Sequence, residues 1–362
     1  MVRDIYYNIV YLVIVSIITL FSLLIKQDIR PQDNKESILG SILITMAFVL
    51  FIGSRPVSYV FGDTPAYAEA LRDGSFIDRQ VTWSGNYLFQ QMMAFLSERG
   101  ASPRALFMIM AAINFGCTLV AVRKLFPDNT MLAMTVFFGA FSTFSAATNG
   151  LKSGCAAALF LVAIAYRDKR IISLLFLFLS LGFHHSMQLP ILAYIACSLY
   201  KNTKVYLILW LVCLLAAASN ITFFMSLFAG YTDEKGADYL LTQVDSVDAI
   251  FGGKTGFRID FVLYSVVPII VGYFAVVRKG IESVEFRFIY NMYLFVNAIW
   301  MLCMYAQYTN RIAYLSWFLY PVLIIYPFFK MDWSSEEKSK LPIYVVLGHL
   351  GFTLFMHFIY YA

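Results

Sequence analysis

Long apolar stretches recur along the chain from end to end and alternate with short polar segments. A stretch of about 20 apolar residues is long enough to cross the hydrocarbon layer of a bilayer as an α-helix. The pattern therefore predicts an all-α, polytopic membrane protein. The predicted full spans lie near residues 5–25, 37–54, 105–122, 131–148, 150–166, 205–225, 259–277, 288–306, 312–329 and 342–361.

Two further segments do not fit a simple span. Residues 171–200 carry no Asp, Glu, Lys or Arg, and they are long for one span but short for two. We interpret them as a tight hairpin with His184 and His185 at its tip, which gives twelve spans in total. Residues 83–97, WSGNYLFQQMMAFLS, are short and rich in Gln and Asn, which favours an interfacial or re-entrant segment.

Composition supports the membrane class and limits the alternatives. The chain is 60% hydrophobic and only 14% charged, too little polar surface for a soluble domain of 362 residues. We therefore predict one integral membrane domain over residues 1–362. The first apolar segment lacks a small-residue cleavage pattern and is expected to be a retained span rather than a signal peptide. All cysteines fall in apolar segments and are expected to be packing residues rather than disulfides or metal ligands: Cys117, Cys155, Cys197, Cys213 and Cys303.

Charge predicts the orientation of the chain. If the N-terminus is outside and residues 83–97 do not cross, more than half of the 27 Lys and Arg fall in cytoplasmic loops, as the positive-inside rule requires. The net charge of +5 then reflects these loops and does not point to a nucleic-acid partner. The outer loops near residues 55–104 and 226–258 are expected to form the active-site face.

The segment SRPVSYVFGDTPAYAEALRDG, residues 54–74, carries the first candidates. Arg55 leaves the second predicted span, and Pro56 ends that helix. Gly62 to Pro65 predicts a turn followed by a helix start. Asp63 is then either the cap of that helix or a carboxylate held at the membrane surface as a base or orienting group.

Two more candidate groups come from apolar segments. In NGLKSG, residues 149–154, the glycines allow close helix packing, and Lys152 is either a snorkelling residue or a cation at the helix mouth. A lone histidine in an apolar run is usually structural. The pair His184 and His185 at a predicted hairpin tip favours a water-filled cavity, because ionisable groups at membrane depth are commonly functional.

The last candidates are two arginines at predicted span starts. Arg258 follows a glycine-rich turn in GGKTGFRID, and it either pairs with a neighbour such as Asp260 or binds an anion. Arg311 begins a span beside Tyr308 and Tyr314, which indicates either an aromatic belt with an anchoring arginine or a guanidinium directed at a phosphate.

Together these motifs place cations, a carboxylate and imidazoles on one predicted membrane face with many aromatic residues. That set suits a ligand that combines a phosphate or pyrophosphate, a sugar and a lipid tail. Metal binding is not predicted, because adjacent histidines point in different directions on a helix and no carboxylate lies near them in sequence.

The order of the motifs resembles the EpsG-like branch of the Wzy-type bacterial polysaccharide polymerases. The matching pieces are the arginine before GDTPAY, then NGLKSG, FHHS, GFRIDFVLYS and NMYLFVNAIWMLCMYAQYTNRIAYLSWFLYP, which cover most of residues 50–330. The chain departs from this resemblance at Lys152, where the family usually has arginine. Lysine keeps the charge but lacks the bidentate fork.

The resemblance implies a glycosyltransferase with a C-type fold in the bacterial inner membrane, active on the periplasmic side without a cofactor or metal. It would transfer a growing glycan from undecaprenyl pyrophosphate to the terminal sugar of a new lipid-linked repeat unit. Arg311 and Arg258 would bind the pyrophosphate, with Arg55 and Lys152 in support. Asp63, His184 and His185 compete for the role of base, and Asp63 is slightly favoured. The histidines, His184 first, would then bind the pyrophosphate or polarise the leaving oxygen. A chain-length regulator and a flippase are expected partners.

Three other functions remain open from the sequence. An O-antigen ligase would use the same donor groups. A flippase or transporter for the lipid-linked repeat unit usually has inverted repeats and charges at the membrane midplane, and the sequence shows neither pattern. A structural subunit of a membrane assembly would need none of these charged groups.

Overall fold

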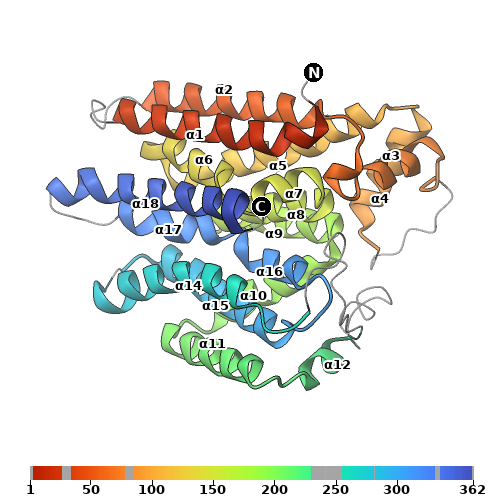
Figure 1. Cartoon of the computed structure of the whole chain (residues 1–362). Coiled ribbons are helices and arrows are strands. Elements are labelled where there is room, and N and C mark those ends of the chain that lie inside the picture. Colours follow the sequence, from red (N-terminus) through yellow and green to blue (C-terminus); the bar gives the residue numbers. More distant parts are fainter. Residues whose placement is uncertain are drawn as a thin grey trace. The chain divides into compact units, whose positions relative to one another are not determined.

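The computed structural model describes residues 3–26, 34–77, 85–229, 241, 255–280, 282–330 and 335–360. Within these ranges every regular element is helical and no strand occurs. The chain divides into two compact units, one formed by Met1–Met187 with Phe328–Ala362 and the other by Gln188–Pro327 (Figure 1). A compact unit is not by itself an independent domain, so the single membrane domain over residues 1–362 stays a prediction.

The first unit contains the N-terminal half of the chain and its C-terminal residues. Its helices are α1 (Tyr7–Lys26), α2 (Asn34–Gly53), α3 (Thr64–Arg72), α4 (Tyr87–Glu98), α5 (Pro103–Leu125), α6 (Thr130–Phe138), α7 (Thr143–Thr148), α8 (Leu151–Ala165), α9 (Arg170–Phe183) and α18 (Ser335–Phe355). Helix α8 lies at its centre and contacts α5, α7 and α9. A side chain at Gly154 would collide with the carbonyl oxygen of Ala146 and the amide of Asn114, so the predicted close packing at this glycine is confirmed.

The second unit is built around α15. Its helices are α10 (Gln188–Leu199), α11 (Thr203–Ala218), α12 (Phe223–Ala229), α14 (Ile259–Tyr273), α15 (Val284–Leu302), α16 (Thr309–Trp317) and α17 (Tyr320–Lys330), the last of which runs into the first unit. Helix α15 contacts α10, α11, α14 and α16.

A buried polar network joins four helices of the second unit. The side-chain oxygen of Asn297 accepts a hydrogen bond from Nε1 of Trp210 at 2.7 Å, and its amide nitrogen donates to Ser265 at 3.1 Å and Ser316 at 3.0 Å. Nε1 of Trp317 donates to the same Ser265 oxygen at 2.8 Å. Because these contacts satisfy both ends of the Asn297 amide in an apolar core, the network fixes the packing of α11, α14, α15 and α16.

Within the described part of the chain, five helical segments are long and apolar enough to cross a membrane, and four apolar helices are shorter. The long ones are Asp4–Leu24, Pro103–Leu125, Ile259–Arg278, Thr309–Lys330 and Lys340–Tyr360, and the short ones are Ile38–Gly53, Leu151–Ala165, Arg170–Phe183 and Thr203–Ala218. These segments support the predicted membrane class. The number of twelve spans and the C-type glycosyltransferase fold stay predictions.

Several predicted boundaries can be compared with the helices. Residues 131–148 do not form the single predicted helix, because α6 ends at Phe138 and α7 begins at Thr143, whose hydroxyl donates to the Phe137 carbonyl at 2.7 Å. Residues 205–225 are also interrupted, at Asn220, which has a left-handed backbone. The predicted break at the histidines is confirmed, since α9 ends at Phe183 and α10 begins at Gln188. The hairpin itself stays a prediction.

The segment predicted to be interfacial or re-entrant, residues 83–97, contains α4, and its residues 83 and 84 lie outside the described ranges. Helix α4 contacts α3 and α9 of the same unit. Figure 1 shows α3 and α4 together beyond the end of α2. Of the predicted outer loop 226–258, residues 230–240 and 242–254 lie outside the described ranges.

We predict that Asn297→Ala lowers the free energy of unfolding by about 2 kcal/mol, because the buried Trp210 nitrogen and two hydroxyls lose their shared partner. Unfolding of the purified protein in detergent measures this. Lys204→Ala, at an exposed position of α11, is the control and is expected to change stability by less than about 0.5 kcal/mol. Equal effects of the two substitutions would contradict the structural role of the network.

Candidate active site

Arg55 is a buried cation at the ends of two helices. Its side chain is 1% exposed, and it donates to the Ile52 carbonyl near the end of α2 at 2.8 Å and to the Thr148 carbonyl at the end of α7 at 3.2 Å. Its guanidinium lies 4.1 Å from the ring centre of Phe107. Burial lowers the pKa of Arg55 to about 10, so it stays charged at neutral pH. The carbonyls at helix C-termini lack helical partners and carry partial negative charge, which explains how this cation is held.

The turn with Asp63 is docked onto the residues that precede α8. The Thr64 hydroxyl donates to the same Thr148 carbonyl at 3.0 Å, and the Asp63 backbone N–H donates to the Asn149 side-chain oxygen at 3.0 Å. Gly62 has a φ of 58°, which L-residues rarely adopt, and a side chain there would collide with Asn149. The turn is therefore fixed by hydrogen bonds on one side and close contact on the other.

Asp63 is exposed at the N-cap position of α3, but its side chain makes no capping hydrogen bond. The simple capping interpretation therefore does not account for the carboxylate. Its backbone is held while its side chain lies at the surface, an arrangement compatible with either role predicted for it.

Lys152 lies in the first turn of α8, directly after the first residue of the helix, Leu151. Its Nζ lies 5.9 Å from the ring centre of Tyr67 on α3 and 5.5 Å from that of Phe89 on α4. The two rings make an edge contact with each other at 5.6 Å between centres. The ammonium thus lies within cation–π range of two aromatic rings, and it joins α8 to both short helices.

The histidines lie in the interruption between α9 and α10. His184 has an extended backbone, and a short 3-10 helix, His185–Met187, follows. The side-chain oxygen of Asn86 accepts the His185 backbone N–H at 2.7 Å and lies 3.2 Å from Nδ1 of His184. Nδ1 of His185 is buried and has no hydrogen-bond partner in the described part of the chain. Such a buried ring nitrogen needs a partner, which a bound ligand could supply.

Five of the seven candidates therefore belong to one linked set of loops in the first unit. Arg55, Asp63, Lys152, His184 and His185 are connected through Thr148, Asn149, the Tyr67–Phe89 pair and Asn86. The structure brings together the elements that carry them, although the five residues come from three separate stretches of sequence.

The other two candidates belong to the second unit. Arg258 makes two hydrogen bonds to the Asp260 carboxylate, 2.9 Å from Nε to Oδ1 and 2.5 Å from Nη2 to Oδ2, so the predicted pairing with a neighbour is present. Its guanidinium also lies 3.8 Å from the ring centre of Phe261. Arg311 is exposed in the first turn of α16, with its guanidinium 4.6 Å from the ring centre of Tyr308.

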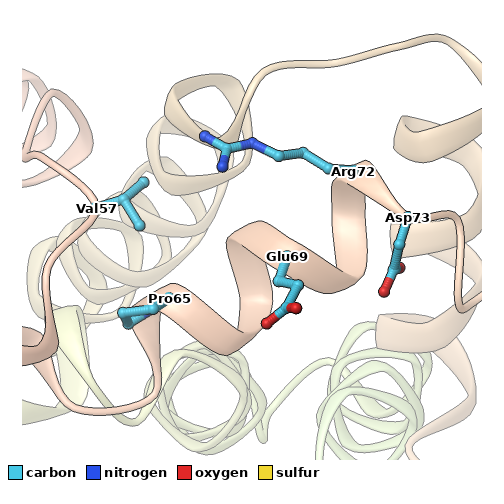
Figure 2. Close-up of a pocket in the computed structure, with 5 residues that line it drawn as sticks. All are labelled: Val57, Pro65, Glu69, Arg72 and Asp73. Atoms are coloured by element: carbon cyan, nitrogen blue, oxygen red, sulfur yellow. The ribbon is translucent and has the colours of Figure 1, made fainter.

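A shallow surface pocket of about 460 Å³ lies beside α3, next to the Asp63 turn. Figure 2 shows its lining: Val57 on the loop before α3, Pro65, Glu69 and Arg72 along the helix, and Asp73 directly after it. Its rim carries both charges, and polar groups of this kind can hydrogen-bond to hydroxyl groups.

No group of three or more His, Cys, Asp or Glu side chains that could hold a metal ion occurs within the described ranges. The five cysteines, all in described residues, form no disulfide.

Sequence reasoning missed Asn86 and Asn149, the two amides that hold the candidate loops. A local signal existed for both, because each is next to a glycine, in Gly85–Asn86 and Asn149–Gly150. Such pairs mark turns and left-handed backbone, but their distant partners are invisible in the sequence.

The helices and the charged loops together define an α-helical membrane protein with a polar site built on the ends of its helices. The chain belongs to the EpsG family, which it matches over residues 38–362, and the predicted resemblance is confirmed. This membership indicates a membrane protein of the polysaccharide-polymerase type, and the family is generally glycosyltransferase-like. No curated protein and no solved structure matches the chain.

We predict that Gly62→Ala destabilises the protein more than Gly100→Ala does. Both glycines have positive φ angles, 58° and 61°, which L-residues rarely adopt. Only at Gly62 does the added carbon meet another side chain, that of Asn149, whereas nothing lies within 4 Å of it at Gly100. Thermal unfolding in detergent should show a larger loss for Gly62→Ala, and Asn149→Gly should recover part of it. An equal loss at both glycines would contradict the docking of the turn on Asn149.

Proposed function

We propose that this protein polymerises oligosaccharide repeat units carried on undecaprenyl pyrophosphate, at the periplasmic face of a bacterial inner membrane. The observation that carries this proposal is the linked set of loops in the first unit, which holds a carboxylate, an ammonium and two imidazoles on neighbouring elements of a protein of the EpsG family. A glycosyl transfer needs a proton acceptor and positive charge near a departing phosphate, and these side chains can provide both.

The reaction is a group transfer between two lipid-linked glycans. The acceptor hydroxyl oxygen forms a bond to the anomeric carbon of the growing chain. The bond from that carbon to the pyrophosphate oxygen breaks, and its electron pair leaves with undecaprenyl pyrophosphate. The hydroxyl proton passes to a base on the protein. The transition state has oxocarbenium character, and negative charge grows on the pyrophosphate.

The cations are assigned to the pyrophosphate. Arg311 is exposed and its guanidinium can form a bidentate contact with a phosphate, so it has the first role. Arg258 has the same role, and its ion pair with Asp260 would have to be shared with the ligand. Arg55 contributes by holding the Asp63 turn, because its fork is engaged by backbone carbonyls, and Lys152 adds charge at the start of α8.

The base is Asp63 or one of the histidines. Asp63 has a fixed backbone and an exposed side chain. The histidines are held by Asn86. The buried Nδ1 of His185 can form a hydrogen bond with a ligand atom. The shallow pocket beside α3 would accept sugar hydroxyl groups near Asp63. A flippase that supplies the repeat unit and a regulator of chain length are the proposed protein partners.

We predict that Arg311→Ala lowers the rate of polymer formation by about 100-fold or more, because a cation aimed at the leaving group acts where charge develops. The assay uses purified protein in detergent with the undecaprenyl-pyrophosphate repeat unit as sole substrate and a chelator present, read as a ladder on a gel.

Arg287→Ala is the control, because Arg287 is an exposed arginine of the same unit in a predicted cytoplasmic loop. It should form polymer at the normal rate. Normal ladders from Arg311→Ala would remove Arg311 from the site. Transfer to an added lipid A core without any ladder would instead identify a ligase.

A further inference from the structure

Asn86 occupies an unusual position at the start of α4. Its backbone is left-handed, with φ of 61° and ψ of 55°, a conformation that asparagine adopts more readily than most residues. Its carbonyl accepts the Gln90 N–H at 3.0 Å and so begins the helix. Asparagine at this position usually caps the helix with its side chain, but the Asn86 side chain makes no capping hydrogen bond.

The side chain of Asn86 is directed instead at the loop with His184 and His185, which follows α9. Its Oδ1 accepts the backbone N–H of His185 at 2.7 Å and lies 3.2 Å from Nδ1 of His184. Helices α4 and α9 pack closely here, since a side chain at Gly182 would collide with Leu88. One amide oxygen therefore holds both the backbone and the ring of the histidine loop.

These two contacts fix which nitrogen of His184 carries a hydrogen. A backbone N–H can only donate, so the Asn86 atom that meets it must be the carbonyl oxygen and not the amide nitrogen. That oxygen can only accept, so Nδ1 of His184 must be the donor. In a neutral imidazole only one nitrogen is protonated, and Nε2 then carries the acceptor lone pair.

We infer that Asn86 is a positioning residue that orients His184 and holds it in the Nδ1–H tautomer, so that Nε2 is the atom that accepts the proton of the acceptor hydroxyl. This inference rests on the proposed glycosyl transfer and selects His184 among the candidate bases. The hydroxyl proton moves to Nε2 while the hydroxyl oxygen bonds to the anomeric carbon and the pyrophosphate departs with the bonding electron pair. Fixing the ring in advance removes the cost of orienting it during the reaction.

Charged groups on the surrounding helices are few. Among the described residues of α4, α8 and α9, the charged side chains are Lys152 in the first turn of α8, Glu98 at the end of α4 and Arg170 at the start of α9. Glu98 and Arg170 are about 20 Å from the histidines along their helices. Lys152 lies 5.5 Å from the ring centre of Phe89 on α4, the helix that begins after Asn86.

Three substitutions test the inference. Asn86→Gly keeps the left-handed backbone and removes the acceptor oxygen. Asn86→Asp keeps an acceptor in the same place and adds a negative charge. Asn220→Gly is the matched control, because Asn220 is an exposed asparagine with φ of 57° in the other unit.

Two measurements are made on each variant of the full chain. Polymer formation is followed against pH to give kcat and KM, and nitrogen NMR of protein with ¹⁵N-labelled histidine rings reports the tautomer without any substrate. His184→Gln identifies the His184 signal among the four histidines of the chain.

We expect Asn86→Gly to lose about 100-fold in kcat with little change in KM, and the His184 ring to populate both tautomers. Asn86→Asp should retain activity, with the acid limb of its pH profile moved upward by about one pH unit, because a carboxylate stabilises the protonated ring. Asn220→Gly should match the unchanged protein in both measurements.

The outcomes separate the inference from the proposed function. If the unchanged protein forms polymer, full activity and an unshifted profile in both Asn86 variants would overturn the inference. An Nε2–H signal for His184 in the unchanged protein would also overturn it, whatever the activity. If the unchanged protein shows the Nδ1–H tautomer but makes no polymer under any condition, the proposed function fails while the positioning of His184 by Asn86 stands.

Discussion

The candidate site depends on a buried positive charge that is held by helix ends instead of a carboxylate. Removing a guanidinium from water is costly, and the carbonyls at the C-termini of α2 and α7 offset part of that cost for Arg55. The Thr148 carbonyl also accepts from Thr64, so the same atom ties the Asp63 turn to the start of α8. Because the partners are backbone atoms, the contact fixes the path of the chain at this turn.

Two asparagines extend this arrangement to the remaining loops. Asn149 holds the Asp63 turn, and Asn86 holds the histidine break, each by accepting a backbone N–H from a distant part of the chain. Catalytic groups on loops are effective only when their supports are rigid, and here the supports are the ends of packed helices. Arg258 and Arg311 belong to the other compact unit, where Arg258 already has a carboxylate partner and Arg311 is exposed.

Much of the helical framework could be predicted, because apolar periodicity and length report burial and membrane spans directly. Neighbouring residues in the sequence indicated the helix break at His184, the close packing at Gly154 and the ion pair of Arg258 with Asp260. The interruption between α6 and α7 was not visible, because the apolar sequence gives no sign that the Thr143 hydroxyl donates to the Phe137 carbonyl near the end of α6. The roles of Asn86 and Asn149 were invisible for a different reason, because their partners lie 99 and 86 residues away in sequence.

The most direct test of where the chemistry occurs is photo-crosslinking with an undecaprenyl-pyrophosphate oligosaccharide that carries a photoreactive group on its terminal sugar. The purified protein is irradiated with this probe, digested, and the labelled peptides are identified by mass spectrometry. Labelling is predicted in the loops of the first unit that contain Asp63, Asn149 and His184. Labelling confined to α1 and α18, with none in these loops, would contradict the placement of the acceptor sugar at this site.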